Sequence, residues 1–253
     1  MKAILLCAGY ATRLRPLTEN FPKPLLPVGG RPMLDWIVDR VEEVTDDVHV
    51  VTNRRYADAF ERWADGRAVV HDDGTSTNED RLGAIGDIRF TIEQARIDDD
   101  LLVIAGDNLF DYSLADYVSW WRGKGRSSAV ALHDVGDLRL ASQYGVAELD
   151  AGERFVDFVE KPPEPRSTLA TTATYLFHRD HVPLVGDYLR SGEPPDPPGR
   201  FIAWLYEREP VYGYRFEGEW LDIGDHEQLL EADNRLRRRA GLPERDRYTL
   251  DTE

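Results

Sequence analysis

The chain has 253 residues, of which 42 % are hydrophobic, and its 47 acidic against 31 basic residues give a formal net charge of −16. This composition supports a folded core and excludes intrinsic disorder, while the acidic balance disfavours nucleic acid and anionic lipid as partners. The apolar runs, such as 101–105, are far shorter than the ~20 residues that cross a bilayer, so we expect a soluble protein without a membrane span.

Short apolar runs alternate with amphipathic segments over the first half of the chain. The runs at 2–7, 48–52, 68–71, 101–105 and 127–133 predict strands, and the segments at 33–44, 54–64, 79–95 and 113–123 predict helices. Strands that alternate with helices form βαβ units, whose strands run parallel in one sheet. We therefore expect an α/β fold with a mostly parallel central sheet and helices on both faces.

The pattern changes after Tyr144. Residues 145–149 and 154–160, joined by Asp150-Ala151-Gly152-Glu153, predict a small antiparallel hairpin. Strands are expected at 171–178 and 211–216, helices at 180–190 and 225–240, and an irregular proline-rich loop at 191–199. No repeat or linker divides the chain, so we expect a single domain over residues 1–253.

Two segments near the N-terminus carry the first chemical signal. The loop after the first strand is small and flexible and holds Arg13, whose guanidinium and neighbouring backbone amides suit phosphate oxygens. Taken alone, that loop is better explained as an ordinary βα turn with one surface arginine, because it lacks the spacing of a Rossmann dinucleotide or P-loop motif. Ten residues later Lys23, one of only four lysines in the chain, stands among Pro22, Pro24 and Pro27. A rigidly presented ammonium suits a polyphosphate.

Together these segments resemble the signature of a known family. Ala8-Gly9-Tyr10-Ala11-Thr12-Arg13-Leu14-Arg15-Pro16-Leu17-Thr18, followed by Pro22-Lys23-Pro24-Leu25-Leu26-Pro27-Val28, is similar to the signature of the sugar-1-phosphate nucleotidyltransferases, the group that contains glucose-1-phosphate thymidylyltransferase. The resemblance implies a Rossmann-like nucleotidyltransferase fold. It also implies Mg²⁺-dependent transfer of a nucleoside monophosphate from an NTP, with dTTP or UTP favoured, to a sugar 1-phosphate, with glucose 1-phosphate favoured.

The resemblance assigns residues to the metal and to the sugar phosphate. Asp107, in Gly106-Asp107-Asn108, and Asp222, in Trp220-Leu221-Asp222-Ile223-Gly224, correspond to the family's two magnesium-binding aspartates. Singly, each is as well explained by a turn or a helix cap. The sugar-phosphate site is expected to comprise Asn108, Tyr144, Gly145, Glu160, Lys161 and Tyr175. In that assignment Glu160 accepts hydrogen bonds from sugar hydroxyls, and Lys161 orients the attacking phosphate.

The nucleotide site is expected in residues 1–110 and the sugar-phosphate site with the C-terminal helix in 111–253. The residues expected at the nucleotide are Leu6, Ala8, Gly9, Tyr10, Ala11, Thr12, Arg13, Lys23, Asn78, Leu82 and Gly83. Arg13 and Lys23 offset the charge of the triphosphate, and with Asp107 and Lys161 they form the expected catalytic set.

The sequence departs from the family pattern at several positions. Cys7 stands where the family commonly has Ala, and Ala11 where it commonly has Gly, a change that is harmless only at negative φ. Ala173-Thr174 replaces a glycine usually found before the aromatic residue of that strand. The glutamine that pairs with thymine or uracil is not visible, and Asn78 either substitutes for it or caps a helix. The base is therefore left open.

Two alternatives remain beside this reading. One is a cytidylyltransferase that acts on phosphocholine or another small phosphate, and the other is a regulatory subunit that binds NTP or a sugar nucleotide without catalysis. The expected partners are the NTP and the sugar 1-phosphate, with neither nucleic acid nor membrane, and a homo-oligomer is left open. Because Cys7 is the only cysteine and no intramolecular disulfide can form, we expect a cytoplasmic protein.

Overall fold

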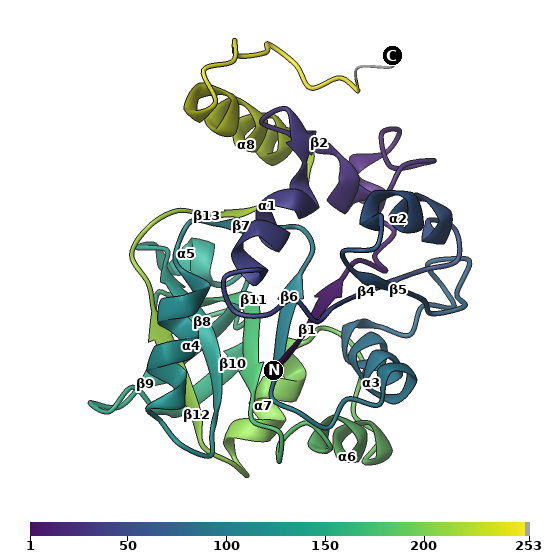
Figure 1. Ribbon diagram of the computed structural model, residues 1–253. Coiled ribbons are helices and arrows are strands. Elements are labelled where there is room, and N and C mark those ends of the chain that lie inside the picture. Colours follow the sequence, from purple (N-terminus) through teal and green to yellow (C-terminus); the bar gives the residue numbers. More distant parts are fainter. Residues whose placement is uncertain (251–253) are drawn as a thin grey trace.

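The computed structural model describes residues 1–250 and has a nine-stranded central sheet flanked by helices (Figure 1). Its strands are β1 (Lys2–Leu6), β4 (Val48–Thr52), β5 (Val69–Asp72), β6 (Leu101–Ala105), β8 (Ser128–Asp134), β9 (Gly145–Leu149), β10 (Phe155–Glu160), β11 (Leu169–Phe177) and β12 (Val211–Arg215). The α-helices are α1 (Met33–Val41), α2 (Ala57–Ala64), α3 (Ala84–Ala95), α4 (Leu114–Arg122), α5 (Leu138–Ala141), α6 (Leu184–Arg190), α7 (Gly199–Tyr206) and α8 (His226–Arg239).

Most of the sheet is parallel, as expected. The order β5-β4-β1-β6 is parallel throughout, with Leu5 opposite Val50 on one side and Ile104 on the other. The next strand, β11, runs antiparallel to β6 and to β8, and β12 pairs in parallel with β8. The expected hairpin is present, because β10 pairs antiparallel with β9. The predicted fold class is confirmed.

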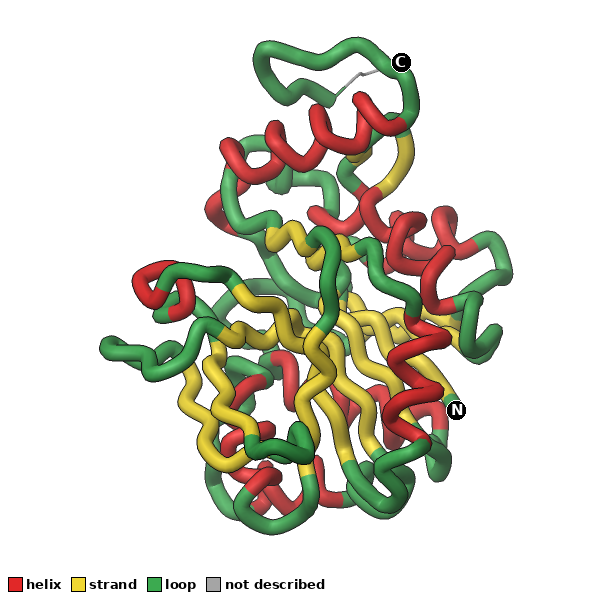
Figure 2. The backbone as a smooth tube through the Cα atoms, turned by 90° about the vertical axis from the view of Figure 1, so that its left-hand side faces the viewer, coloured by secondary structure: helices red, strands yellow, loops and turns green. Residues whose placement is uncertain are grey.

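The helices cover both faces of the sheet because successive strand residues point to opposite sides. In β1, Leu5 joins a buried cluster that includes residues of α1, α2, α4 and α8, whereas Ile4 joins a second cluster with residues of α3, α6 and α7. Figure 2 shows the strands side by side, with helices on either side of them. Strands that are buried on both faces explain why the N-terminal runs are continuously apolar.

Several elements begin later than expected or were not expected. The helix predicted from residue 79 begins at Ala84, because the amides of Ser76 and Thr77 donate to Asp80 in a local turn and Gly83, at φ 78°, precedes the helix. Helix α2 begins at Ala57 and α6 at Leu184. Helix α7 directly follows the proline-rich loop and was not predicted. Two short antiparallel pairs, β2 (Pro27–Val28) with β3 (Arg31–Pro32) and β7 (Asn108–Phe110) with β13 (Trp220–Asp222), were also missed.

Helix α8 packs against the segment that follows Lys23 and its neighbouring prolines. The Asp233 carboxylate of α8 accepts a hydrogen bond from the Gly29 amide at 2.8 Å, and a β-carbon added at Gly29 would meet the Leu236 β-carbon at 2.6 Å. The helix therefore lies directly against β2 (Figure 1). Within residues 1–250, no helix is both long and apolar enough to cross a membrane.

Candidate active site

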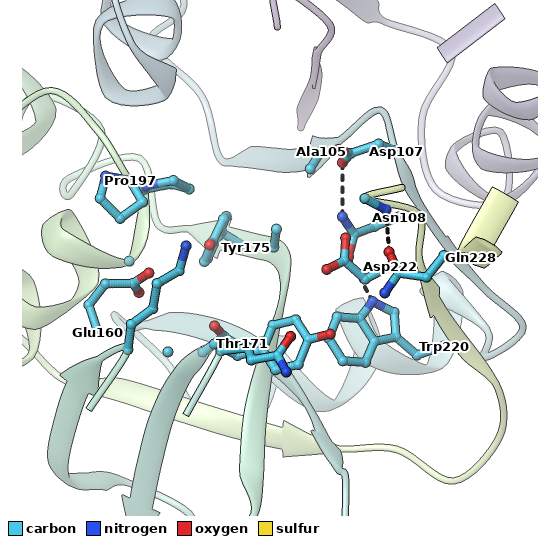
Figure 3. Close-up of a pocket in the computed structure, with 18 of the residues that line it drawn as sticks. Ala105, Asp107, Asn108, Glu160, Thr171, Tyr175, Pro197, Trp220, Asp222 and Gln228 are labelled. Atoms are coloured by element: carbon cyan, nitrogen blue, oxygen red, sulfur yellow. Dashed lines mark hydrogen bonds between the residues drawn. The ribbon is translucent and has the colours of Figure 1, made fainter. Parts of the chain in front are cut away.

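A cavity of about 550 Å³ has residues of β6, β9, β10 and β11 in its walls. It is lined by Arg13, Ala105, Asp107, Asn108, Gln143, Tyr144, Gly145, Glu160, Lys161, Thr171, Ala173, Tyr175, Pro197, Pro198, Gly199, Trp220, Asp222, Gly224, Asp225 and Gln228. Figure 3 shows Asp107, Asp222 and Trp220 on one side, Glu160 and Pro197 on the other, and Tyr175 and Thr171 between them. The cavity thus collects side chains from segments far apart in the sequence.

Asp107 and Lys23 form the central ion pair of the site. Asp107 follows β6, and Lys23 begins a one-turn 3₁₀ helix (Lys23–Leu25) between its prolines. The Lys23 ammonium lies 2.7 Å from the Asp107 carboxylate, and Lys23 is only 8 % exposed. Burial raises the pKa of Asp107, but the charge and hydrogen bond of Lys23 outweigh burial and lower that pKa overall. Asp107 is therefore ionised at neutral pH.

The other oxygen of Asp107 is held by a chain of hydrogen bonds. The Asn108 amide donates to Asp107 Oδ1 at 2.9 Å, and the Trp220 indole N–H donates to Asn108 Oδ1 at 2.7 Å (Figure 3). The pairing of β7 with β13 places Asp222 opposite Asn108. This two-stranded pair therefore brings the second carboxylate to the first, across more than one hundred residues of sequence.

The two carboxylates form a pair that suits a hard cation. Burial, and then the negative charge of Asp107, raise the pKa of Asp222 to about 6, although Lys23 and Arg13 act in the opposite direction. The shift reflects the cost of a second buried negative charge beside Asp107, and carboxylate oxygens are the ligands that Mg²⁺ prefers. In residues 1–250 no group of three or more His, Cys, Asp or Glu gathers around a common point. A metal held by these two carboxylates would take its remaining oxygen ligands from water or from substrate phosphates.

The opposite wall of the cavity is built around Glu160 and two glycines. A β-carbon added at Gly199 would lie 1.8 Å from Glu160 Oε2, and one added at Gly145 would lie 2.9 Å from the same oxygen. Only glycine at these positions leaves room for the carboxylate. Burial raises the pKa of Glu160, and the neighbouring Lys161 opposes this rise. Tyr175, on β11, also lines the cavity and is 2 % exposed.

A smaller cavity of about 160 Å³ lies beside the first. It is lined by Leu6, Cys7, Gly9, Ala11, Arg13, Lys23, Pro24, Asp107 and Gly224. Ala11 has φ 44° and ψ 47°, so the condition under which alanine would be harmless here is not met, and its backbone lies in the left-handed region that favours glycine. The Thr18 hydroxyl donates to the Ala11 carbonyl at 2.8 Å and holds this left-handed backbone in place.

The remaining residues expected at the nucleotide lie outside the walls of these two cavities. The Ala8 carbonyl accepts from the Asn53 amide at 2.9 Å, and Tyr10 is buried with its hydroxyl 3.4 Å from Thr75 Oγ1. Thr12 is exposed at the start of a short 3₁₀ helix. Asn78, Leu82 and Gly83 lie before α3, and their assignment to the base stays a prediction.

Several lining residues were not identified from the sequence. They are Ala105, Gln143, Thr171, Ala173, Pro197, Pro198, Gly199, Trp220, Gly224, Asp225 and Gln228. Some carried a signal, because Trp220 and Gly224 flank Asp222, and Gln228, whose side chain accepts from the Gly224 amide at 2.7 Å, follows four residues later. Nothing in the sequence of the proline-rich loop predicts that Pro197, Pro198 and Gly199 line the cavity.

Comparisons with known proteins agree with this geometry. A family model described as "Nucleotidyl transferase" matches residues 2–239. The bifunctional protein GlmU of Methanocaldococcus jannaschii is 30 % identical over 239 residues, covering 93 % of this chain and 54 % of the relative. A UTP–glucose-1-phosphate uridylyltransferase of Synechocystis is 31 % identical over 238 residues, covering 88 % of this chain and 60 % of the relative.

A solved structure shares the fold. It is a chain from Bacillus anthracis, described as a candidate glucose-1-phosphate thymidylyltransferase in complex with sucrose, and it matches with a TM-score of 0.78 at 24 % identity, covering 94 % of this chain and 95 % of that one. The chain spans 54 to 60 % of the length of the two curated relatives. Because the family model matches nearly the whole chain, the protein belongs to the nucleotidyl transferase family.

Proposed function

We propose that the protein transfers a nucleoside monophosphate from an NTP to a sugar 1-phosphate and releases pyrophosphate. One observation carries this proposal: Arg13, Asp107 and Gly224 line both cavities. The smaller cavity has the backbone loop and Lys23, which suit a triphosphate, and the larger one has the volume and the polar walls for a sugar phosphate. The reacting phosphates would meet where the two cavities share their wall.

The chemistry needs no nucleophile from the protein. A phosphate oxygen of the sugar 1-phosphate attacks the α-phosphorus in line, the bond from that phosphorus to the bridging oxygen breaks, and pyrophosphate leaves with the electron pair. Arg13 and Lys23 stabilise the negative charge of the triphosphate and of the leaving group. Lys161 binds and orients the attacking phosphate, and Glu160 accepts hydrogen bonds from the sugar.

Asp107 and Asp222 are the residues that would hold Mg²⁺. When bound, the metal neutralises charge on the phosphate oxygens. The raised pKa of Asp222 and the hydrogen bonds that fix Asp107 support this assignment. In the same assignment, residues 1–110 bind the NTP, and residues 111–253 supply the sugar-phosphate site together with Asp222 and α8.

The favoured substrates are dTTP or UTP and glucose 1-phosphate. The similarity to the Synechocystis uridylyltransferase, named for UTP and glucose 1-phosphate, supports this choice. The two alternatives, a cytidylyltransferase and a non-catalytic subunit, are distinguished by an assay of pyrophosphate release. A cytoplasmic location stays a prediction that rests on Cys7, which is buried and free.

The direct test is pyrophosphate release with Mg²⁺ over five NTPs and a panel of sugar 1-phosphates plus phosphocholine. Release with dTTP or UTP and glucose 1-phosphate supports the proposal. Release only with CTP and phosphocholine supports a cytidylyltransferase, and no release with any pair contradicts catalysis and leaves the regulatory subunit. A Lys23→Ala variant should lose activity by orders of magnitude in the same assay.

A further inference from the structure

Strained backbone is concentrated at the site. Among residues 1–250, six non-glycine residues have positive φ: Ala11, Asp65, Arg96, Glu153, Lys161 and Ala173. Asp65 and Arg96 end helices α2 and α3, and Glu153 lies in the turn of the hairpin, all places where a left-handed residue is common. The other three line the two cavities. Left-handed backbone disfavours residues with a β-carbon, and such strain gathers at functional sites.

Ala173, with φ 51°, lies where β11 changes partners. On one side of it Thr171 pairs with Leu132 of β8, and on the other side Tyr175 pairs with Val130. Three residues of β11 therefore stand opposite a single residue of β8, which is a β-bulge. From Thr174 onward β11 also pairs with β6, whereas Ala170 pairs with β9. The bulge thus lies where β11 passes from β9 to β6, and residues on both sides of it line the larger cavity.

The bulge is held by contacts that do not involve the side chain of Ala173. The Thr172 hydroxyl donates to the Ala131 carbonyl at 3.1 Å, and the strand pairs on both sides of the bulge fix the backbone. Thr171 and Tyr175 line the cavity on either side of Ala173, and Figure 3 shows both between Glu160 and the carboxylate pair. Glycine would adopt the same φ without strain. The difference from glycine is therefore one methyl group at the cavity wall.

We propose that Ala173 determines which sugar phosphates the larger cavity accepts: its methyl group occupies space that a glycine would leave to a bulky ring substituent. This inference rests on the proposed function and adds the size class of the acceptor. The strand pairs and the Thr172 hydrogen bond hold the strained alanine in place, so its methyl group stays where it would exclude larger acceptors. One methyl or methylene group in a closely fitting pocket changes selectivity about tenfold or more.

The test is the A173G variant, compared with wild type on glucose 1-phosphate and N-acetylglucosamine 1-phosphate at saturating NTP. The two acceptors differ only where an acetamido group replaces a hydroxyl. We expect the ratio of kcat/KM for the N-acetylated over the plain acceptor to rise about tenfold in A173G. The Tm should also rise, because the positive φ no longer carries a β-carbon.

The matched control is Asp65→Gly. Asp65 is exposed, has φ 44° at the end of α2, and lies outside both cavities. D65G should raise the Tm by the same mechanism and leave the acceptor ratio at the wild-type value. A ratio in A173G within twofold of wild type, with the Tm raised, would overturn the inference, because the strain would then have been relieved without any effect on selectivity.

A second measurement separates this inference from the proposed function. Thermal unfolding in the presence of each sugar phosphate, without NTP, reports acceptor binding even in a protein that does not turn over. Stronger protection of A173G by the N-acetylated acceptor, relative to the plain one, supports the inference whether or not pyrophosphate is released. Equal relative protection in A173G and wild type contradicts it.

Discussion

The two sides of the site are built in different ways. The nucleotide side comes mainly from adjacent segments of chain: apart from Asp107 and Gly224, the residues that line the smaller cavity all lie between Leu6 and Pro24. The acceptor side is assembled from β9, β10, β11, the proline-rich loop and the segment around Asp222, and it depends on two glycines and a left-handed alanine. A contiguous motif fixes the first side, and close packing between distant segments fixes the second.

Asp107 belongs to both sides, so its removal should have the largest effect. D107N removes one of two carboxylates that would hold the metal and the charged partner of Lys23, 2.7 Å away. We expect kcat to fall about a thousandfold or more, as when a main electrostatic contributor is removed. Pyrophosphate release at increasing Mg²⁺ measures this, with far-UV circular dichroism as the control for folding. Activity within tenfold of wild type in a folded variant would remove Asp107 from the mechanism.

Gly199→Ala should damage the acceptor side alone. The new β-carbon would overlap Glu160 Oε2 at 1.8 Å, so the carboxylate has to leave its position in the cavity wall. We expect KM for the sugar phosphate to rise about tenfold to a hundredfold, the cost of a lost hydrogen-bonding group, with KM for the NTP unchanged.

The control for this variant is Gly152→Ala in the hairpin turn, where the added β-carbon meets only the Asp150 carboxylate at 3.3 Å. In G152A, KM for the sugar phosphate and KM for the NTP should both equal the wild-type values. An equal rise of both KM values in G199A would show that the nucleotide side and the acceptor side are not independent of each other.

A buried acid that lies outside both cavities makes the free energy of unfolding depend on pH. Asp87 is 7 % exposed in the first turn of α3, and burial, then Asp73 and Asp196, raise its pKa to about 8. Asp196 comes from the proline-rich loop, and the neighbouring Pro195 carbonyl accepts from the Ile85 amide. Because the folded state keeps a proton that the unfolded state releases near pH 4, stability falls as pH rises from about 4 to about 8.

The free energy of unfolding should fall by up to about 1.4 kcal/mol per pH unit in this range, and the substitution Asp87→Asn should remove this pH dependence. Urea unfolding at pH 6 and pH 7 measures the change: wild type should lose up to about 1.4 kcal/mol more than D87N between the two values. D87N should also be the more stable protein at pH 8. If the free energies of unfolding of wild type and D87N changed equally with pH, Asp87 would be ionised in the folded state and the prediction would be wrong.

The sequence predicts features that depend on neighbouring residues, and it does not predict features that depend on contacts between distant segments. Regular elements such as β1, β4 and β6 follow from apolar runs. Lys23, Asp107 and Asp222 were assigned to the site from motifs that lie next to them in the chain; all three line the cavities, and their roles stay predictions. Gly199 and Ala173 were missed as site residues because their roles depend on Glu160 and on the partners of β11, which no local pattern reveals. The three-residue strands β7 and β13 are too short to have a periodicity, yet they bring Asp222 to Asn108.

Trp220→Phe should have the smallest effect and shows how the two sides are joined. The substitution keeps an aromatic ring and removes the N–H that donates to Asn108 Oδ1 at 2.7 Å, so Asn108 is less firmly oriented toward Asp107. The loss of one such hydrogen bond costs about 1 kcal/mol, which corresponds to about fivefold in affinity. We expect the Mg²⁺ concentration for half-maximal activity to rise by that factor while KM for the NTP stays constant. A change in KM for the sugar phosphate without any change in the Mg²⁺ requirement would instead show that the Trp220 ring contacts the acceptor and that its N–H does not act through Asp107.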